Sequence, residues 1–195
     1  MKTTNKKGIS TEKLVLLALL TAMTAVLSYL GGFIKIGSFA SISLTLIPVV
    51  LGAALCGPYA GAWLGAVASV VFFITPDAAW WMSLSAHGTV ITVMIKGIAA
   101  GLAAGLVYKL FEKFNRYVAI MAAAVVCPVV NTGLFISGCF IFFLDSVKEG
   151  AIGNGMSVFA FIMIFYVGLN FLFELLSNVI FSPVILRLLN IREKK

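Results

Sequence analysis

Long apolar runs separated by short polar segments make up almost the whole chain. The runs predict six membrane helices, because most of them approach the ~20 apolar residues that cross a bilayer as a helix. The segments lie at residues 14–31, 43–75 (which holds the second and third helices), 87–109, 117–144 and 157–189. The pattern therefore predicts an all-α membrane protein, a bundle of six transmembrane helices.

The run 43–75 is too long for one span and is broken at Cys56-Gly57-Pro58. Proline cannot continue the hydrogen bonding of a preceding helix, and glycine permits a tight turn. The second helix, 43–56, is then only about 20 Å long, shorter than the ~30 Å hydrocarbon core. We expect neighbouring helices to shield it, or a buried irregular segment to follow it.

Composition supports the membrane interpretation. Of the 195 residues, 62% are hydrophobic and 11% are charged, whereas about a quarter are charged in soluble domains. We expect residues 1–195 to form a single integral membrane domain. The net charge of +7 does not indicate a nucleic-acid partner, because the basic residues cluster between apolar segments instead of forming one basic face.

The basic residues also predict the orientation, because cytoplasmic loops carry an excess of Lys and Arg. With both termini in the cytoplasm, eleven of the 14 basic residues lie inside, Lys35 and Lys148 lie outside, and Lys96 lies within the membrane. Residues 1–13 then form a cytoplasmic N-terminal segment and residues 190–195 a cytoplasmic tail. The segments that face outward are 31–42, 75–86 and 145–155.

Lys96 is the most unusual position, since it lies in an apolar segment, about 13 Å below the outer end of its helix. A charge exposed to lipid costs several kcal/mol, so an intramembrane lysine is a candidate functional group. Its cation suits a ligand carboxylate or phosphate. Two alternatives remain open: a side chain that snorkels to the surface, and a structural ion pair with Glu174.

Two asparagines reach a similar depth from other segments. Asn131 can donate and accept, so it can recognise an amide or hydroxyl of a ligand; the alternative is an interhelical hydrogen bond. A stripe of polar residues at steps of four occupies one face of the last segment: Tyr166, Asn170, Glu174 and Asn178. We expect ligand contact from the outer part of this stripe and a structural or coupling role for Glu174.

Trp80, Trp81 and His87 lie on the outer side. Tryptophan is common at membrane interfaces, but a pair beside a cavity can also cap a flat ligand. His87 is the only histidine, and without a cluster of ligating residues we expect no metal and no other cofactor. Lys96 should face Asn131 and the outer part of segment 157–189, beneath the outer segments.

Small residues form two further patterns. Glycines recur every four residues at 61 and 65 and again at 97, 101 and 105, which predicts close helix packing within the chain. Ala18, Ala22 and Ala25 make a smooth face on the first segment. That face can pack internally or dock an external helix, and the spacing alone does not decide between these.

The ordered motifs resemble the S components of energy-coupling factor (ECF) transporters over nearly the whole chain. The first is Ala18-Leu19-Leu20-Thr21-Ala22, an AxxxA motif, and the second is the run SLTLIP at 43–48 leading to CGPYAG at 56–61. The others are Lys96-Gly97 before a small-residue helix and NFLFELLSNVIFSP at 170–183. Each motif is weak, and their order and spacing carry the match.

The resemblance implies a function and partners that composition does not. S components bind a vitamin or related micronutrient from outside the cell (plasma) membrane. They associate with a transmembrane scaffold subunit and two ATPase subunits, and transport is thought to involve toppling of the S component. The resemblance assigns the scaffold contact to Ala18 and Ala22, with Ala25 beside them. It assigns a gate to segment 31–42, where Phe39 is a candidate ligand contact.

Pantothenate is the favoured ligand, because a cation and an amide suit an anionic, amide-bearing molecule. Many relatives have arginine at the position of Lys96, and lysine keeps the charge but lacks the bidentate fork. Riboflavin, folate, a pyrimidine precursor and a queuosine precursor remain open, and the paired tryptophans favour a flat ring instead.

Other function classes are less well supported. The sequence has no GxxxxGK[ST] phosphate loop, so we expect ATP hydrolysis in separate subunits and no enzyme activity in this chain. A stand-alone carrier or channel would need a repeat or a continuous polar path. A membrane hydrolase would need clustered acidic, His or Ser/Lys groups. A purely structural protein would pair Lys96 with Glu174.

Overall fold

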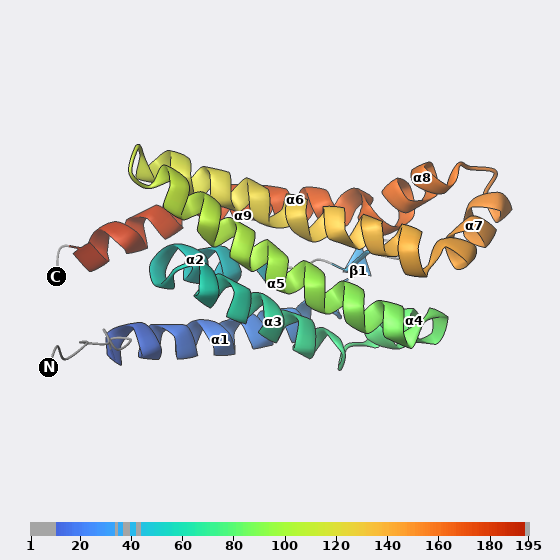
Figure 1. Ribbon diagram of the computed structural model, residues 1–195, viewed down its shortest axis with the longest axis horizontal. Helices are drawn as coiled ribbons and strands as arrows, with labels where there is room; N and C mark the ends of the chain where they lie inside the picture. The colour runs from blue at the N-terminus through green and yellow to red at the C-terminus, as the bar shows by residue number, and fades with distance from the viewer. Residues whose placement is uncertain (1–10, 34, 37–39, 42–43, 194–195) are drawn as a thin grey trace, which may run out of the picture.

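The computed structural model describes residues 11–33, 35–36, 40–41 and 44–193 (Figure 1). Helices dominate these residues, and two short strands form a small hairpin. In chain order the elements are α1 (Thr11–Gly31), β1 (Lys35–Ile36), β2 (Ala40–Ser41), α2 (Leu46–Cys56), α3 (Pro58–Phe72), α4 (Pro76–Leu84), α5 (Ala86–Phe111), α6 (Arg116–Phe142), α7 (Leu144–Gly153), α8 (Val158–Phe161), the π-helix η1 (Ile162–Val167) and α9 (Gly168–Glu193).

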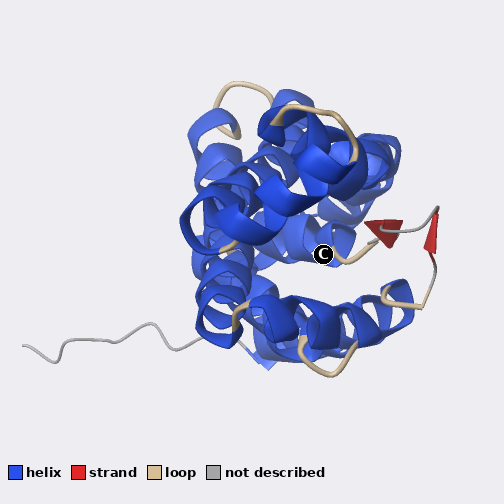
Figure 2. Ribbon diagram, turned by 90° about the vertical axis from the view of Figure 1, so that its right-hand side faces the viewer, coloured by secondary structure: helices blue, strands red, loops and turns tan. Residues whose placement is uncertain are grey.

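The long helices lie lengthwise beside one another (Figure 1). The start of α1, the turn between α5 and α6 and the end of α9 lie at one end of the bundle, while α4, α7 and α8 lie at the other (Figure 1). The hairpin pairs Lys35 with Ser41 and Ile36 with Ala40 in antiparallel register, and lies at the edge of the bundle (Figure 2). The basic turn, the start of α1 and the end of α9 therefore belong to the same end of the bundle.

Four helical stretches within the described residues are long and apolar enough to cross a membrane: Thr11–Gly31, Ala86–Phe111, Arg116–Phe142 and Val158–Leu188. The pair α3 and α4 would be a fifth span if it counts as one, although the two helices are bent by 82°. The remaining apolar helix, α2, has 11 residues. Apolar helices thus form the body of the protein, as the hydrophobic pattern predicts.

The predicted break between the second and third segments is confirmed. Gly57 has a φ of 103°, a conformation that glycine adopts without a steric penalty, and Pro58 begins α3 at its first position,. Eight of the 11 residues of α2 are buried, and α2 contacts α1, α3, α5, α6 and α9. Neighbouring helices therefore shield this short helix, as expected.

Two of the segments that we expected to face outward are largely helical. Pro76 begins α4 after the extended residue Thr75, so the paired tryptophans lie on a helix instead of a loop. The segment 145–155 likewise contains most of α7. Proline is well suited to the first turn of a helix because its missing N–H has no intrahelical acceptor there.

The predicted helix over 157–189 is present as one helical stretch, Val158–Leu188, but its first third is not regular α-helix throughout. The structure divides it into α8, η1 and α9, and the π-helix occupies Ile162–Val167. A π-turn adds a residue to the helical repeat, which changes the direction of the following side chains. Such turns are frequent at functional sites, and a periodic apolar pattern does not reveal them.

The glycines of α3 and α5 pack against each other, which confirms the predicted close contact. A Cβ atom at Gly65 would lie 2.6 Å from the carbonyl carbon of Gly97, and one at Gly61 would lie 3.0 Å from that of Gly101. The Ser69 hydroxyl, one turn further along α3, donates to the Val93 carbonyl of α5 at 2.8 Å. The two helices therefore meet backbone to backbone, which fixes how each is rotated about its axis.

We expect Gly65→Ala to destabilise the protein by roughly 1–3 kcal/mol, the usual effect of overpacking a tight contact. The added methyl group would meet the backbone of Gly97, which cannot move like a flexible side chain. Thermal unfolding of the purified protein measures the effect. Gly133→Ala is the matched control, because nothing lies within 4 Å of a Cβ at Gly133. Equal unfolding temperatures for the two variants would contradict the packing role.

Candidate functional site

A cavity of about 280 Å³ opens between α4, α5, α6 and the start of the last helical stretch. It lies toward the end of the bundle that carries α4, because it includes residues from the end of α3 and from α4 (Figure 1). Its lining combines aromatic, amide, hydroxyl and charged side chains: Phe72, Pro76, Asp77, Trp80, Trp81, Thr89, Thr92, Val93, Lys96, Asn131, Thr132, Phe135, Phe143, Tyr166, Val167 and Asn170.

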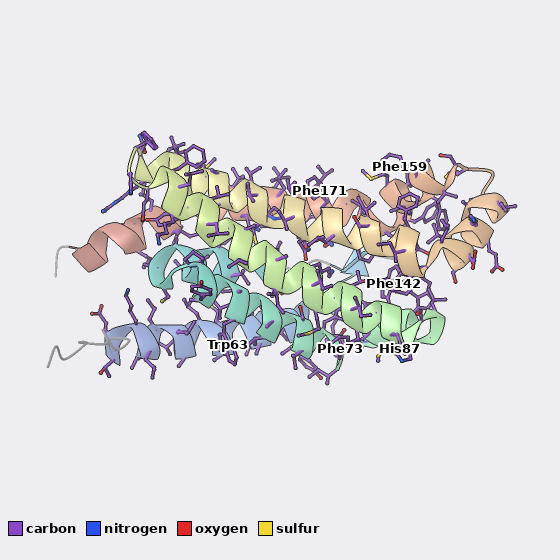
Figure 3. All side chains as sticks on the ribbon, in the orientation of Figure 1. Trp63, Phe73, His87, Phe142, Phe159 and Phe171 are labelled. Atoms are coloured by element: carbon purple, nitrogen blue, oxygen red, sulfur yellow. The ribbon has the colours of Figure 1, made fainter. Side chains whose placement is uncertain are left out.

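The structure brings most of the sequence-predicted ligand residues to this one cavity. Those in the lining are Lys96, Asn131, Asn170, Trp80, Trp81 and Tyr166. His87 is exposed near the start of α5, points away from the bundle (Figure 3) and is not part of the lining. Phe39 lies outside the described residues. The cavity therefore joins residues from four separate segments of the chain, and His87 is not among them.

Lys96 is partly buried and does not face open lipid. Its ammonium nitrogen Nζ lies 5.1 Å from the centroid of the Phe135 ring, a cation–π arrangement that stabilises a desolvated cation. Glu174 is near enough to act on Lys96 electrostatically, but within the described residues no ion pair joins the two side chains. The cation therefore remains available at the cavity wall.

Glu174 instead accepts hydrogen bonds from two asparagines. Its side chain is only 2% exposed. Asn131 Nδ2 donates to Oε2 at 3.3 Å, and Asn170 Nδ2 donates to Oε1 at 3.4 Å. Asn178 Nδ2 donates to the backbone carbonyl of Glu174 at 2.8 Å. A buried carboxylate thus links α6 to α9 directly beneath the amides that line the cavity, in the inner part of the predicted polar stripe.

Aromatic rings form the wall of the cavity on the side of α4. The centroid of Trp81 lies 5.2 Å from those of Phe135, Phe143 and Tyr166, with interplanar angles of 86°, 71° and 63°. Trp80 packs edge-on against Trp81 at 4.7 Å. Edge-to-face contacts of this kind are favourable for aromatic pairs. The Trp81 ring is therefore held in place by protein rings before any ligand binds.

Sequence reasoning missed several lining residues that share a helix face with those it found. Thr89 and Thr92 precede Lys96 by seven and four positions, and Phe135 follows Asn131 by four. Residues three, four and seven apart lie on one side of a helix. Thr89, Thr92 and Phe135 could therefore be identified from the sequence as residues on the same helix sides as Lys96 and Asn131. Phe72 and Phe143 carry no such signal, because they lie at helix ends.

The alanine face of the first helix is open to its surroundings. Ala18 and Ala22 are exposed, and Ala25 is half-buried. Thr21, beside them, accepts a hydrogen bond from Trp63 Nε1 of α3 at 3.1 Å. Only Leu20, Thr24 and Gly31 of α1 are fully buried. Ala18 and Ala22 therefore do not pack inside the described part of the chain.

Comparison with known families gives one match that spans most of the chain. The model of the family described as "ECF transporter, substrate-specific component" matches residues 12–188. Searches of curated proteins and of solved structures give no match. The matched range includes every residue of the cavity lining and the exposed alanine face of α1. The chain therefore belongs to the ECF transporter substrate-specific component family, a family of multi-pass membrane proteins that bind a substrate for transport and are not enzymes.

Proposed function

We propose that the protein captures a small anionic micronutrient, with pantothenate as the favoured ligand, for an ATP-driven ECF importer of the plasma membrane. The observation that carries the proposal is the meeting of Lys96, Asn131 and Asn170 in one cavity. An intramembrane cation without an ion pair suits a ligand carboxylate, and the amides suit hydroxyl or amide groups. The membrane position and the family both favour binding for transport over catalysis.

The size and walls of the cavity favour pantothenate over the larger alternatives. About 280 Å³ is near the lower end of the ~300–1,000 Å³ that ligand pockets usually have. Riboflavin and folate are longer and carry large flat rings. Three protein rings already pack against Trp81 in T-shaped contacts, which leaves less room for stacking on a flat ligand. Pyrimidine and queuosine precursors remain the alternatives of suitable size.

The proposed topology has six crossings with both termini in the cytoplasm. It counts the shielded helix α2 and helix α3 as separate short crossings. The start of α1, the basic turn after α5 and the end of α9 share one end of the bundle (Figure 1), which supports a common cytoplasmic side. The cavity then opens toward the outer side, where a micronutrient arrives.

The proposed partners are a transmembrane scaffold subunit and two ATPase subunits. The exposed alanines Ala18 and Ala22 support a scaffold contact on α1, since small residues let helix backbones approach closely. Segment 31–42 is the proposed gate. Its strand β2 contacts η1 and α9, the elements that carry Tyr166, Val167 and Asn170 of the cavity lining.

The bound ligand should copurify with the protein and be identifiable by mass spectrometry of the extracted small molecules. We expect pantothenate. The control is the same extraction from Lys96→Ala protein.

Cells should take up the ligand only when the ATPase subunits are present and active. Uptake by this chain alone at normal expression levels, unaffected by loss of ATP, would contradict the coupled mechanism and favour a stand-alone carrier.

Lys96→Ala should weaken pantothenate binding by about tenfold or more, because a hydrogen bond to a charged group contributes roughly 1.5–3 kcal/mol. Lys96→Arg keeps the charge and should retain part of the affinity. Isothermal titration of the protein in nanodiscs measures both variants. Lys148→Ala, an exposed lysine of α7, is the control. Full binding by Lys96→Ala would show that Lys96 has a structural role.

Replacing Ala22 by Trp should leave ligand binding unchanged and abolish both assembly with the scaffold subunit and uptake. The large side chain would stand on the exposed small-residue face of α1, away from the cavity. Copurification with the tagged scaffold subunit measures assembly. Val125→Trp, at a 38% exposed position of α6, controls for bulk at the lipid-facing surface. Normal assembly by the Ala22 variant would place the scaffold contact elsewhere.

A further inference from the structure

The carboxyl group of Glu174 accepts one hydrogen bond from each of two asparagines that line the cavity. Its two oxygens are used separately: Asn131 Nδ2 donates to Oε2 and Asn170 Nδ2 donates to Oε1. The donors come from different helices, α6 and α9. Both asparagines also line the cavity, whereas Glu174 lies behind them and is not part of the lining.

An ionised carboxylate can only accept hydrogen bonds. Each amide must therefore turn its nitrogen toward Glu174 and its oxygen away, because the opposite orientation would set oxygen against oxygen. A protonated carboxyl donates through one oxygen only, so even then at least one of the two amides keeps its nitrogen on Glu174.

This orientation leaves a buried hydrogen-bond acceptor without a donor on a residue that lines the cavity. Asn170 Oδ1 is buried and has no partner within the described residues, and the same is true of the Thr92 hydroxyl. Both residues line the cavity. Nearly all buried polar atoms in proteins are paired, and an unpaired one is unfavourable. A ligand group that donates to Asn170 Oδ1 would therefore be selected over one that only accepts.

We propose that Glu174 is a positioning residue that fixes Asn131 and Asn170 with their oxygens away from it, so that the cavity selects an anion that also carries a hydroxyl or N–H donor. The anionic group binds Lys96, and the donor meets the oxygen of Asn170. This inference rests on the proposed function, and it specifies the ligand class of the same cavity. Pantothenate belongs to that class, because it carries a carboxylate, two hydroxyls and an amide N–H.

The amide orientation can be tested without a ligand. In Asn170→Asp an oxygen replaces the nitrogen that faces Glu174, so the unfolding temperature of the protein in nanodiscs should fall. Adding Glu174→Gln supplies a donor to that oxygen and should restore part of the loss. If Asn170→Asp is as stable as the original protein, or if the double variant is no more stable than Asn170→Asp, the orientation is wrong.

The donor requirement can be tested with pantothenate and three analogues, each with one donor blocked by a methyl group: the two mono-O-methyl ethers and the N-methyl amide. In the original protein at least one analogue should bind roughly tenfold more weakly than pantothenate, the effect of one unpaired buried group. In Glu174→Gln the amide of Asn170 is free to turn. The ratio of the Kd of that analogue to the Kd of pantothenate should therefore move toward one. Three analogues that match pantothenate, or a ratio that Glu174→Gln leaves unchanged, would overturn the proposal.

Asn178→Ala is the matched control for general destabilisation. Asn178 is as buried as Glu174 and lies one turn further along α9, but it donates to the backbone carbonyl of Glu174 and leaves the carboxylate oxygens alone. In Asn178→Ala the ratio of the analogue Kd to the pantothenate Kd should equal the ratio in the original protein, even if the unfolding temperature of the variant falls. If pantothenate does not bind at all, the proposed ligand is wrong, and the stability comparison still decides the orientation.

Discussion

The backbone contact between α3 and α5 orients the helices that bring Lys96 and the paired tryptophans to the site. Four glycines, at 61, 65, 97 and 101, let the two helices meet with no side chain between them. Because Gly97 must face α3, the rotation of α5 is fixed, and Lys96 next to it is turned to the neighbouring side, where α6 and the cavity lie. The same contact anchors α3, whose end leads through a short turn into α4 and its tryptophans.

The second constraint is that polar groups inside a membrane protein need partners from the chain or from a ligand. Lys96 has the Phe135 ring and Glu174 has two amides, so neither charge depends on direct contact with the other. In the Asn–Glu–Asn arrangement the two carboxyl oxygens of Glu174 accept from donors on two helices. This arrangement thereby joins α6 to α9 and keeps the cation of Lys96 free for an anion. The site is thus charge-compensated at a distance while remaining open to a ligand.

The sequence predicts the helices and the principal polar residues well because both depend on local patterns. Apolar runs, the Cys56-Gly57-Pro58 break and the glycine repeat each report a local physical requirement, and the structure has all of them. The π-helix before Gly168 escapes this reasoning, since a periodic apolar pattern does not reveal it,. The helical form of segment 76–84 was signalled only by Pro76 at its first position,. The chemistry of His87 and its place in the chain do not show which side of α5 it occupies. The partnership of Glu174 with Asn131, 43 residues away, also requires the tertiary fold.

The cavity is built from two kinds of element, and this difference bears on how a ligand reaches it. Lys96, Asn131 and the buried Glu174 belong to long helices that are held by backbone contact or by the carboxylate network. The opposite wall comes from the nine-residue helix α4 and the six-residue π-helix η1, with the hairpin strand β2 against η1. Short elements with few backbone constraints open at a lower free energy than long packed helices. Entry of a ligand should therefore displace the wall of α4, η1 and the hairpin, while the polar residues that recognise the ligand stay in place.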